Sequence, residues 1–316
     1  MIQGIPKISV LIITYKQENL INRALDSLIK QKAFLYEICV SDDCSPDGTW
    51  DVLLDYQKRY PDLIKLHHND CNLGIFENFE QVFKMPSGEV INMMAGDDEA
   101  GANYFEHVIS FIREKGIDYK NELFCIYSDY EAVYPNGDSM VFSNSSIINN
   151  SDKALRLALR GIIGGRGCCF SINVLKRFDY VSQGRSHKVE HVQDRQIQLN
   201  TENSYYIPCV GNIYYTNIGV SANINEDIRK ERLQIWPFTI EYLKQKGVPI
   251  CKSDINYGKY NVALQIFRFN HSIVNFLNVV KTFVLSRDFS LPDGNYLRHF
   301  YFAIRRRIPH KKPLHI

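Results

Sequence analysis

The sequence predicts an α/β fold: a mostly parallel sheet with helices on both faces, followed by a helical C-terminal extension. The main observation is that short apolar, β-branched runs alternate with segments of helical periodicity over residues 1–100. The first of these runs, residues 8–13, is apolar at nearly every position, which is typical of a strand buried on both faces of a parallel sheet. After residue 224 the periodicity is helical almost throughout.

Composition narrows the class of protein. The chain has 316 residues, of which 45% are hydrophobic and 23% charged, and this excludes a disordered or low-complexity chain. Lys and Arg number 37 against 35 Asp and Glu, so the formal net charge is only +2. A protein with so small a net charge has no strong overall positive potential to attract nucleic acid, and we expect no nucleic-acid partner.

Cysteine usage and hydropathy bear on location. The 8 cysteines form no C-x-x-C pair, which argues against a zinc ribbon or a redox motif. No stretch reaches the roughly 18 uninterrupted apolar residues of a spanning helix. We therefore expect reduced thiols in a cytoplasmic protein that is soluble or peripheral on the cytoplasmic face of the inner membrane.

The first part of the chain is expected to alternate strand and helix. The predicted strands cover residues 8–13, 36–40, 63–66 and 89–94. The predicted helices cover residues 20–31, 50–56 and 75–83. Parallel sheets of this kind bind ligands at the carboxyl ends of their strands. The loops after Ile13, Val40, Leu66 and Met94 are therefore the first places to look for a site.

The pattern then changes. A strand-rich segment over 123–134 is followed by Asn136-Gly137, a hairpin turn signal. Next come a polar loop over 143–151, a helix over 152–159, a glycine-rich stretch over 161–167 and a strand over 168–172. A helix over 192–199 and a pair of strands over 205–215 complete this part. The later helices are interrupted near Gly247 and at 291–294.

Two acidic pairs follow predicted strands. Asp42 and Asp43 come just after the second strand, and Asp97 and Asp98 just after the fourth. Paired carboxylates at strand ends suit Mg²⁺ or Mn²⁺, which prefer oxygen ligands and bridge to phosphates. Carboxylates also accept hydrogen bonds from a base or a ribose hydroxyl. The alternative is that these aspartates serve only as turn and helix-cap residues.

Taken together, these segments resemble family 2 glycosyltransferases with the nucleotide-sugar-binding GT-A fold. The residues that carry the resemblance are Ser9–Tyr15, Leu25–Gln31, Ser41–Thr49, Asn72–Gly74 with Asn78, and Ser87–Val90 leading to Gly96-Asp97-Asp98. Their order and spacing match the family over residues 7 to about 110, and a weaker similarity continues to about 222 through Asp194, Tyr214-Tyr215 and Ser221–Asn223.

The resemblance implies roles for particular residues. It implies a nucleotide-binding set of Thr14, Tyr15, Asp42, Asp43, Asn78 and Asp97. Thr14 and Tyr15 would flank the base, and Asp43 would accept a hydrogen bond from it. Asp97 and Asp98 resemble the end of the family's metal-binding Asp-x-Asp-Asp stretch, which implies a divalent cation, Mn²⁺ or Mg²⁺. Ala95 stands at the first position of that stretch, so one carboxylate of the usual set is missing.

The general base is also implied by the resemblance. The family places it in an acidic pair that opens a helix after the glycine-rich strand, and the match is Asp194, with Gln193 in place of the first acid. Glu190 is the second candidate, and an ordinary helix-terminal role is the alternative for Asp194. Arg166 in the glycine-rich stretch lies near the phosphates in one interpretation and in a flexible connection in the other.

The C-terminal tail is basic and aromatic. Residues 296–316 contain six Lys and Arg and no acidic residue, with apolar and aromatic residues among them. Such a segment suits contact with an anionic membrane or with a lipid-diphosphate acceptor. Packing of a terminal helix on the domain, with a solvated basic end, is an equally open interpretation.

We therefore expect a transferase domain over 1–222 and a helical, membrane-associating extension over 223–316. Within the first, residues 1–100 would bind the nucleotide sugar and 101–222 would face the acceptor. The expected reaction is inverting transfer from a UDP-linked sugar to a glycan or lipid-linked glycan in O-antigen or capsule assembly. The alternative is a non-catalytic nucleotide-sugar-binding protein, which Ala95 and Gln193 keep open. A nucleotidyltransferase would need glycines after the first strand, and Thr14–Glu18 has none.

Overall fold

The chain forms two compact units, Met1–Glu231 and Arg232–Ile316. The computed structural model describes residues 4–145, 151–161, 163, 165–181, 186–216, 218 and 225–288, without the side chains of 151–153 and 268–269. The predictions for Gly164, for Ser221–Asn223, for the break at 291–294 and for the basic tail fall on residues outside this description. Each unit is described by itself below.

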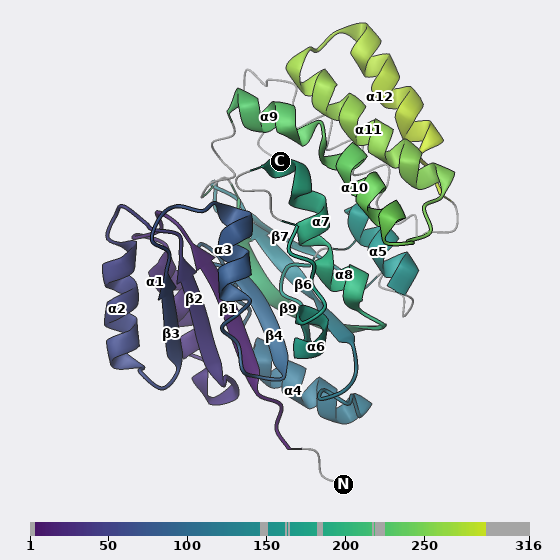
Figure 1. Ribbon diagram of the computed structural model, residues 1–316. Coiled ribbons are helices and arrows are strands. Elements are labelled where there is room, and N and C mark those ends of the chain that lie inside the picture. The colour runs from purple at the N-terminus through teal and green to yellow at the C-terminus, as the bar shows by residue number, and fades with distance from the viewer. Residues whose placement is uncertain are drawn as a thin grey trace. The chain divides into compact units, whose positions relative to one another are not determined.

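The first unit contains a sheet of nine strands among its described residues (Figure 1). In chain order these are β1 (Ile8–Thr14), β2 (Glu37–Asp42), β3 (Ile64–His68), β4 (Val90–Ala95), β5 (Glu99–Ala100), β6 (Phe124–Val133), β7 (Ser139–Phe142), β8 (Cys169–Ser171) and β9 (Asn203–Tyr215). Their order in the sheet is β3-β2-β1-β4-β8-β6-β9-β5, and β7 pairs with β6.

The α/β class is confirmed, and the sheet is mixed. β1 is parallel to β2 and β4, and β2 is parallel to β3, as the alternating pattern predicts. β8 is antiparallel to both β4 and β6, while β6 is parallel to β9. Every residue of β1 and β2 is buried, which explains why these strands read as continuous apolar runs.

Helices flank the sheet in the first unit (Figure 1). They are α1 (Ile21–Ile29), α2 (Thr49–Arg59), α3 (Ile75–Val82), α4 (Tyr104–Lys115), α5 (Ser151–Leu159), α6 (Ile172–Leu175), α7 (Glu190–Asp194) and α8 (Gln196–Asn200), with 3₁₀ turns at Lys32–Phe34 and His187–Val189. A further helix, α9 (Glu226–Arg232), has no buried residue and ends at the division between the two units. The apolar stripe of α1, which includes Ala24, Leu25 and Leu28, packs in the main core with Ile8, Val10 and Ile12 of β1.

Two predicted elements are wrong. The expected pair of strands over 205–215 is the single strand β9, whose register against β6 slips at Pro208-Cys209 and again at Gly211. Both slips are bulges, where proline and glycine are tolerated, and no residue there turns the chain back. The expected helix over 192–199 is divided into α7 and α8, because Arg195 leaves the helical conformation with φ −106° and ψ 8°.

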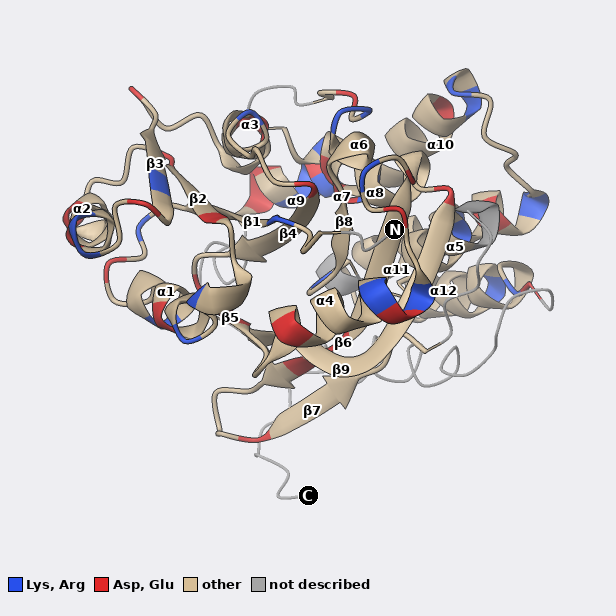
Figure 2. Cartoon of the chain, turned by 90° about the horizontal axis from the view of Figure 1, so that it is seen from below, with Lys and Arg blue, Asp and Glu red and all other residues tan. Residues whose placement is uncertain are grey.

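The described part of the second unit is helical, as expected for the C-terminal extension. It contains α10 (Ile235–Gln245), α11 (Lys252–Phe269) and α12 (Ile273–Leu285). Gly247 follows α10 with a φ of +72°, a left-handed conformation that glycine adopts at low cost, so the predicted break is confirmed. Both basic and acidic positions occur on described helices of each unit (Figure 2).

Candidate functional site

Three predicted site segments meet at one edge of the sheet. In the register of the parallel strands, Thr14 lies opposite Asp42, and Ile13 lies opposite Ala95. Asp42 also lies opposite His68, the last residue of β3. The strands run in the same direction, so the loops after β1, β2, β3 and β4 leave the sheet together. This edge is where open α/β sheets bind ligands.

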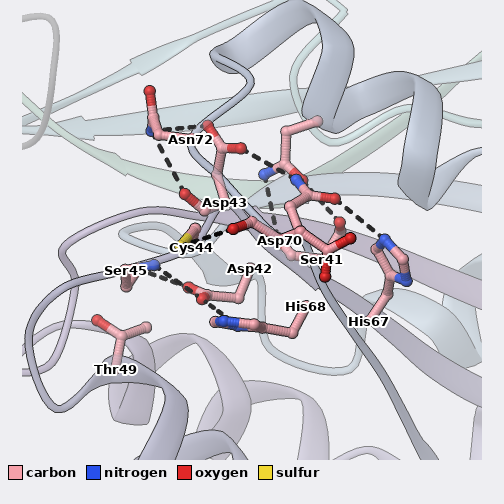
Figure 3. Close-up of polar contacts among 12 residues, drawn as sticks. Ser41, Asp42, Asp43, Cys44, Ser45, Thr49, His67, His68, Asp70 and Asn72 are labelled. Carbon is pink, nitrogen blue, oxygen red and sulfur yellow. Dashed lines mark hydrogen bonds and ion pairs between the residues drawn. The ribbon is translucent and has the colours of Figure 1, made fainter.

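Asp42 is fully buried and fixes the start of the loop after β2 (Figure 3). Its Oδ2 accepts the Ser45 N–H at 3.0 Å, and its Oδ1 accepts the Ser45 hydroxyl at 2.5 Å. The Nδ1 of His68 lies 2.9 Å from Oδ2, and the Trp50 ring packs 4.6 Å from the His68 ring. His68 and Trp50 were not predicted, because nothing local in the sequence marks a histidine at a strand end as a carboxylate partner.

Asp43 is also buried, and its carboxylate orders the loop between β3 and α3 (Figure 3). Oδ1 accepts the Asn69 side-chain amide at 3.0 Å and the Leu73 N–H at 2.8 Å. Oδ2 accepts the Asn72 amide at 2.9 Å and the Gly74 N–H at 2.8 Å. A carboxylate has about four lone-pair sites, so these four donors occupy it. The structure therefore assigns Asp43 a positioning role in this conformation.

Asn78 connects the same network to β2. Its side-chain Oδ1 accepts the Ser41 hydroxyl at 2.6 Å and the Asn69 amide at 3.0 Å, and its Nδ2 donates to the Ser41 carbonyl at 3.1 Å. The residue is only 2% exposed. Like Asp43, it is buried and stabilises the edge of the sheet through its hydrogen bonds. Its contribution to nucleotide binding would come from the position that it gives to the loop between β3 and α3.

The end of β1 presents one buried and one half-buried side chain. The hydroxyl of Thr14 donates to Gln17 Oε1 at 2.7 Å, and the Thr14 carbonyl accepts the Asp43 N–H at 3.0 Å. Tyr15 is half-buried, with the ammonium of Lys16 5.3 Å from its ring centre. Of the two residues expected to flank the base, Tyr15 is therefore the one that offers a ring surface.

Residues of α1 and β9 hold the loop after β4 in place. Arg23 of α1 donates to the Asp97 carbonyl, and its Nε lies 3.5 Å from Glu99 Oε1. Its guanidinium carbon lies 3.4 Å from the ring centre of Tyr215, whose hydroxyl donates to the same Glu99 oxygen. No local sequence pattern indicates these contacts of Arg23, Glu99 and Tyr215, because the three residues come from α1, β5 and β9.

Asp98 is the most unusual carboxylate at this edge. It is 3% exposed, and burial raises its pKa to about 6, against the opposing effect of Arg166. Arg166 Nη1 lies 3.4 Å from Asp98 Oδ2, and the guanidinium carbon lies 3.8 Å from the ring centre of Tyr214. Burial also raises the pKa of Asp97, again opposed by Arg166 and Arg23.

These residues fit a divalent cation that takes some of its ligands from the protein and the others from a substrate. Asp98 Oδ1 is buried and makes no hydrogen bond of ordinary geometry with the described residues. No cluster of three or more acidic, His or Cys side chains suited to a metal exists in the part of the chain that the structure describes. Mg²⁺ is often bound through one or two carboxylates together with substrate phosphates. Asp98, with Asp97 beside it, matches that kind of partial protein shell.

The glycine-rich stretch makes its close approach to β9. Gly167 has a φ of +66°, and a Cβ there would lie 2.9 Å from the Asn212 nitrogen. Its carbonyl accepts the hydroxyls of Tyr104 and, at 2.7 Å, of Ser128. This packing places the neighbouring Arg166 against Tyr214 of β9 and close to Asp98.

Asp194 belongs to α7, whereas the carboxylates described above lie at or just after the ends of β2 and β4. It is the last residue of α7, directly before Arg195 at the break to α8, and its side chain is exposed. Figure 1 draws α7 toward the same end of the sheet as the carboxyl ends of β1 and β2. Glu190, the second candidate, begins α7 and is half-buried, with its Oε2 3.9 Å from His187 Nδ1.

Relatives match the N-terminal part of the chain. A protein of Mycobacterium tuberculosis is 35% identical over 91 residues, which is 28% of this chain and 26% of the relative. The poly(ribitol-phosphate) β-glucosyltransferase of Bacillus spizizenii is 32% identical over 114 residues, 35% of this chain and 18% of that enzyme. The matched segment thus spans only about a quarter of the first relative and less than a fifth of the second.

Solved structures share the fold over nearly the whole chain. Residues 1–349 of TarS from S. aureus superpose with a TM-score of 0.59 at 16% identity, covering 95% of this chain and 88% of that one. The mannosyltransferase PcManGT of Pyrobaculum calidifontis gives a TM-score of 0.52 at 14% identity, covering 95% and 84%.

A family model provides the most direct comparison. The model for glycosyl transferase family 2 matches residues 9–169, a range that includes β1 to β4, both acidic pairs and Arg166. It therefore covers the converging loops described above, and it spans more than half of the 316 residues. The chain belongs to glycosyl transferase family 2.

Proposed function

We propose that this protein is an inverting glycosyltransferase that uses a nucleotide-diphospho-sugar donor, UDP-linked by our expectation, and a divalent cation. The observation that carries the proposal is Asp98, a buried carboxylate beside Arg166 at the carboxyl edge of the sheet, whose Oδ1 makes no hydrogen bond of ordinary geometry with the described residues. Family membership supports the reaction class. The fold neighbours include TarS in complex with UDP-GlcNAc and PcManGT in complex with GDP-Man and Mn²⁺.

The residues at the edge would divide the work of binding the donor. Tyr15 offers a ring face for the base, while Asp42, Asp43 and Asn78 maintain the loops around it. Arg166 brings a guanidinium toward the diphosphate, where negative charge grows as the glycosidic bond breaks. Asp97 and Asp98 would bind the cation, which supplies further positive charge to the leaving diphosphate when bound.

Transfer with inversion needs a single in-line displacement. The acceptor oxygen forms a bond to the anomeric carbon, the bond from that carbon to the diphosphate oxygen breaks, and the acceptor proton passes to a carboxylate. Asp194 is the proposed base, because it is exposed and follows the glycine-rich stretch in chain order, as in the family pattern. It ends α7 and does not open a helix, which differs from that pattern. Glu190, four residues earlier, is the second candidate.

We further propose that the acceptor is a glycan or a lipid-linked glycan in bacterial surface polysaccharide assembly, such as O-antigen or capsule. The named Bacillus relative, a poly(ribitol-phosphate) β-glucosyltransferase, supports a polymeric acceptor. The basic composition of residues 296–316 supports peripheral contact with the cytoplasmic face of a membrane. No helix among the described residues is long and apolar enough to cross a bilayer.

Hydrolysis and transfer assays with paired variants test the proposal. The wild type should slowly hydrolyse one nucleotide sugar in the absence of acceptor, and Asp98→Ala should abolish this hydrolysis. Asp194→Asn should keep donor binding but lose transfer, whereas Glu190→Gln should keep both. Equal donor binding by wild type and Asp194→Asn, with no turnover by either, would instead favour the non-catalytic alternative that Ala95 and Gln193 leave open.

A further inference from the structure

The second unit has its own small core, on one side of α12. Tyr260, Ala263 and Leu264 of α11 pack with Val279 and Phe283 of α12. The two helices run side by side and are joined by the three residues 270–272 (Figure 1). This core accounts for the buried face of α12 and leaves the opposite face to be explained.

The opposite face of α12 is apolar and exposed. The exposed fractions are 68% for Ile273, 70% for Val274, 59% for Leu277, 60% for Val284 and 52% for Leu285. At about 100° per residue, these five side chains share one face about 120° wide. Single exposed apolar residues are ordinary on protein surfaces, but a contiguous group of this size on one helix marks an interaction site.

Charge on and after this helix indicates the kind of partner. Lys281 lies within the apolar face, and α12 has no acidic residue. The sequence after Asp288 adds Arg298, Arg305, Arg306, Arg307, Lys311 and Lys312 against one acidic residue, Asp293. A lysine within an apolar face can lay its stem along that face and place its ammonium among lipid phosphates. Anionic headgroups complement this charge.

A second copy of the chain is a poorer occupant for the same face. Two-fold pairing brings the same patch of both copies together. Pairing through this face would bury one Lys281 from each copy, and α12 offers no acidic residue to neutralise either ammonium. A membrane surface removes this conflict, because the headgroups supply the negative charge.

We infer that the exposed face of α12, defined by Ile273, Val274, Leu277, Lys281, Val284 and Leu285, lies in the surface of an anionic lipid membrane. The helix has 13 residues and is thus about 20 Å long, shorter than a hydrocarbon core of about 30 Å. It therefore lies in the plane of the interface rather than across the bilayer. The inference refines the proposed membrane contact, and it rests on exposed side chains outside the donor site.

Vesicle flotation of the full chain tests the inference. The vesicles consist of phosphatidylcholine alone or of phosphatidylcholine with phosphatidylglycerol. The double substitution Leu277→Asn, Val284→Asn removes apolar contact, and Lys281→Glu reverses the charge within the face. The matched control is Leu54→Asn, on an exposed apolar residue of α2 in the first unit. Circular dichroism melting confirms that each variant is folded.

We expect the wild type and Leu54→Asn to float with the anionic vesicles and to bind neutral vesicles weakly. The double variant and Lys281→Glu should each lose roughly tenfold or more in partitioning. Equal flotation of the double variant and the wild type would overturn the inference, as would no flotation of the wild type. A concentration-dependent dimer that the double variant loses would overturn it in favour of a second copy.

Donor binding, measured on the same preparations, separates this inference from the proposed function. Flotation without binding of any nucleotide sugar would leave the α12 assignment standing and count against the transferase. Donor binding without flotation would overturn the α12 assignment and leave the transferase proposal standing. Neither α12 variant should alter donor binding, because no substituted residue belongs to the edge of the sheet.

Discussion

Asp43 and Asp98 are both buried carboxylates, yet their surroundings give them different tasks. Asp43 accepts four hydrogen bonds from the Asn69–Gly74 loop, so its charge is used inside the protein. Asp98 has one oxygen without a hydrogen bond of ordinary geometry among the described residues, and burial raises its pKa. A buried aspartate whose carboxylate accepts several hydrogen bonds stabilises the fold. A buried aspartate whose carboxylate accepts few hydrogen bonds favours ligand binding at the expense of stability.

Substitution of Asp43 should therefore act on the loop. In Asp43→Asn, one oxygen is replaced by an NH₂ group that faces two N–H donors, which leaves buried donors unpaired. We expect the free energy of unfolding to fall by about 2–4 kcal/mol, and the amides of Leu73 and Gly74 to exchange faster with deuterium. The control is Asp70→Asn, because the Asp70 side chain is exposed. Unchanged exchange at both amides would contradict the positioning role.

Substitution of Asp98 should have the opposite effect on stability. The folded pKa of about 6 lies above the unfolded value of 3.8, so ionisation of this group costs folding free energy. The cost is absent at low pH, grows as pH rises from 3.8 to about 6, and is complete above that. Asp98→Asn should therefore be more stable than wild type by about 1–3 kcal/mol at pH 8.

Denaturant unfolding across the pH range checks this prediction. The stability gap between Asp98→Asn and wild type should shrink as pH falls through about 6, since the wild-type carboxyl then becomes neutral. The same substitution should remove the effect of Mn²⁺ on donor binding. A variant that is less stable than wild type at pH 8 would show that Asp98 supports the fold instead.

Arg166 should act on the phosphates of the donor and not on its base. A charged hydrogen bond is worth about 1.5–3 kcal/mol, so Arg166→Ala should weaken UDP binding by roughly 10- to 100-fold. Uridine, which lacks the diphosphate, should bind the variant and the wild type alike. Arg166→Lys should recover part of the loss. Calorimetric titration measures all of these affinities, and an equal loss for uridine would place Arg166 elsewhere.

The sequence predicted where these residues lie but not what they contact. Asp42, Asp43, Asp97 and Asp98 follow strands, and the register of a parallel sheet brings strand ends together. Their partners come from separate elements, as His68 does for Asp42 and Arg166 does for Asp98. Such pairs depend on side-chain packing across elements, which no local pattern encodes.

At the scale of elements, β9 connects the edge of the sheet to the glycine-rich stretch. A Cβ at Gly211 would lie 2.1 Å from Ser128 Oγ and 2.8 Å from the Gly167 carbonyl oxygen. The bulge at Gly211 therefore sets the distance between β9 and Gly167. The neighbouring residues Asn212, Tyr214 and Tyr215 lie around Asp98, Arg166 and Glu99.

Gly211→Ala should loosen this connection. Overpacking of this kind costs about 1–3 kcal/mol, and the shift of β9 should also weaken donor binding, since Tyr214 supports Arg166. Gly165→Ala is the matched control, because the nearest atom to its added Cβ lies 3.9 Å away. Thermal melting and donor titration compare the two variants. A Gly211→Ala protein with the melting temperature of Gly165→Ala would show that β9 tolerates the methyl group.

Elements with strong periodicity were predictable, and short ones were not. β1 to β4 occur in the expected order because each contains apolar residues of a predicted strand and is followed by a turn or a helix. The division of α7 from α8 depends on the backbone of Arg195, a residue with ordinary helix propensity. The single β9 strand depends on two bulges that only its pairing with β6 defines.

At the scale of the whole molecule, the chain divides at Glu231, and the family match lies entirely within the first unit. Composition predicted an ordinary globular protein, and the buried cores formed by the described residues agree with it. Composition could not predict the exposed face of α12, because Ile273 and Val279 are equally apolar in sequence and differ only in what packs on them.

The central claim is that the carboxyl edge of the sheet binds a nucleotide sugar with a divalent cation. A thermal-shift panel of UDP, GDP, CDP and dTDP sugars, each with and without Mn²⁺, tests it most directly, because a ligand of the folded state raises apparent stability by mass action. We predict a Mn²⁺-dependent shift with one nucleotide, UDP by our proposal, that Asp98→Asn loses. No shift with any donor at saturating concentration, with or without Mn²⁺, would contradict the claim.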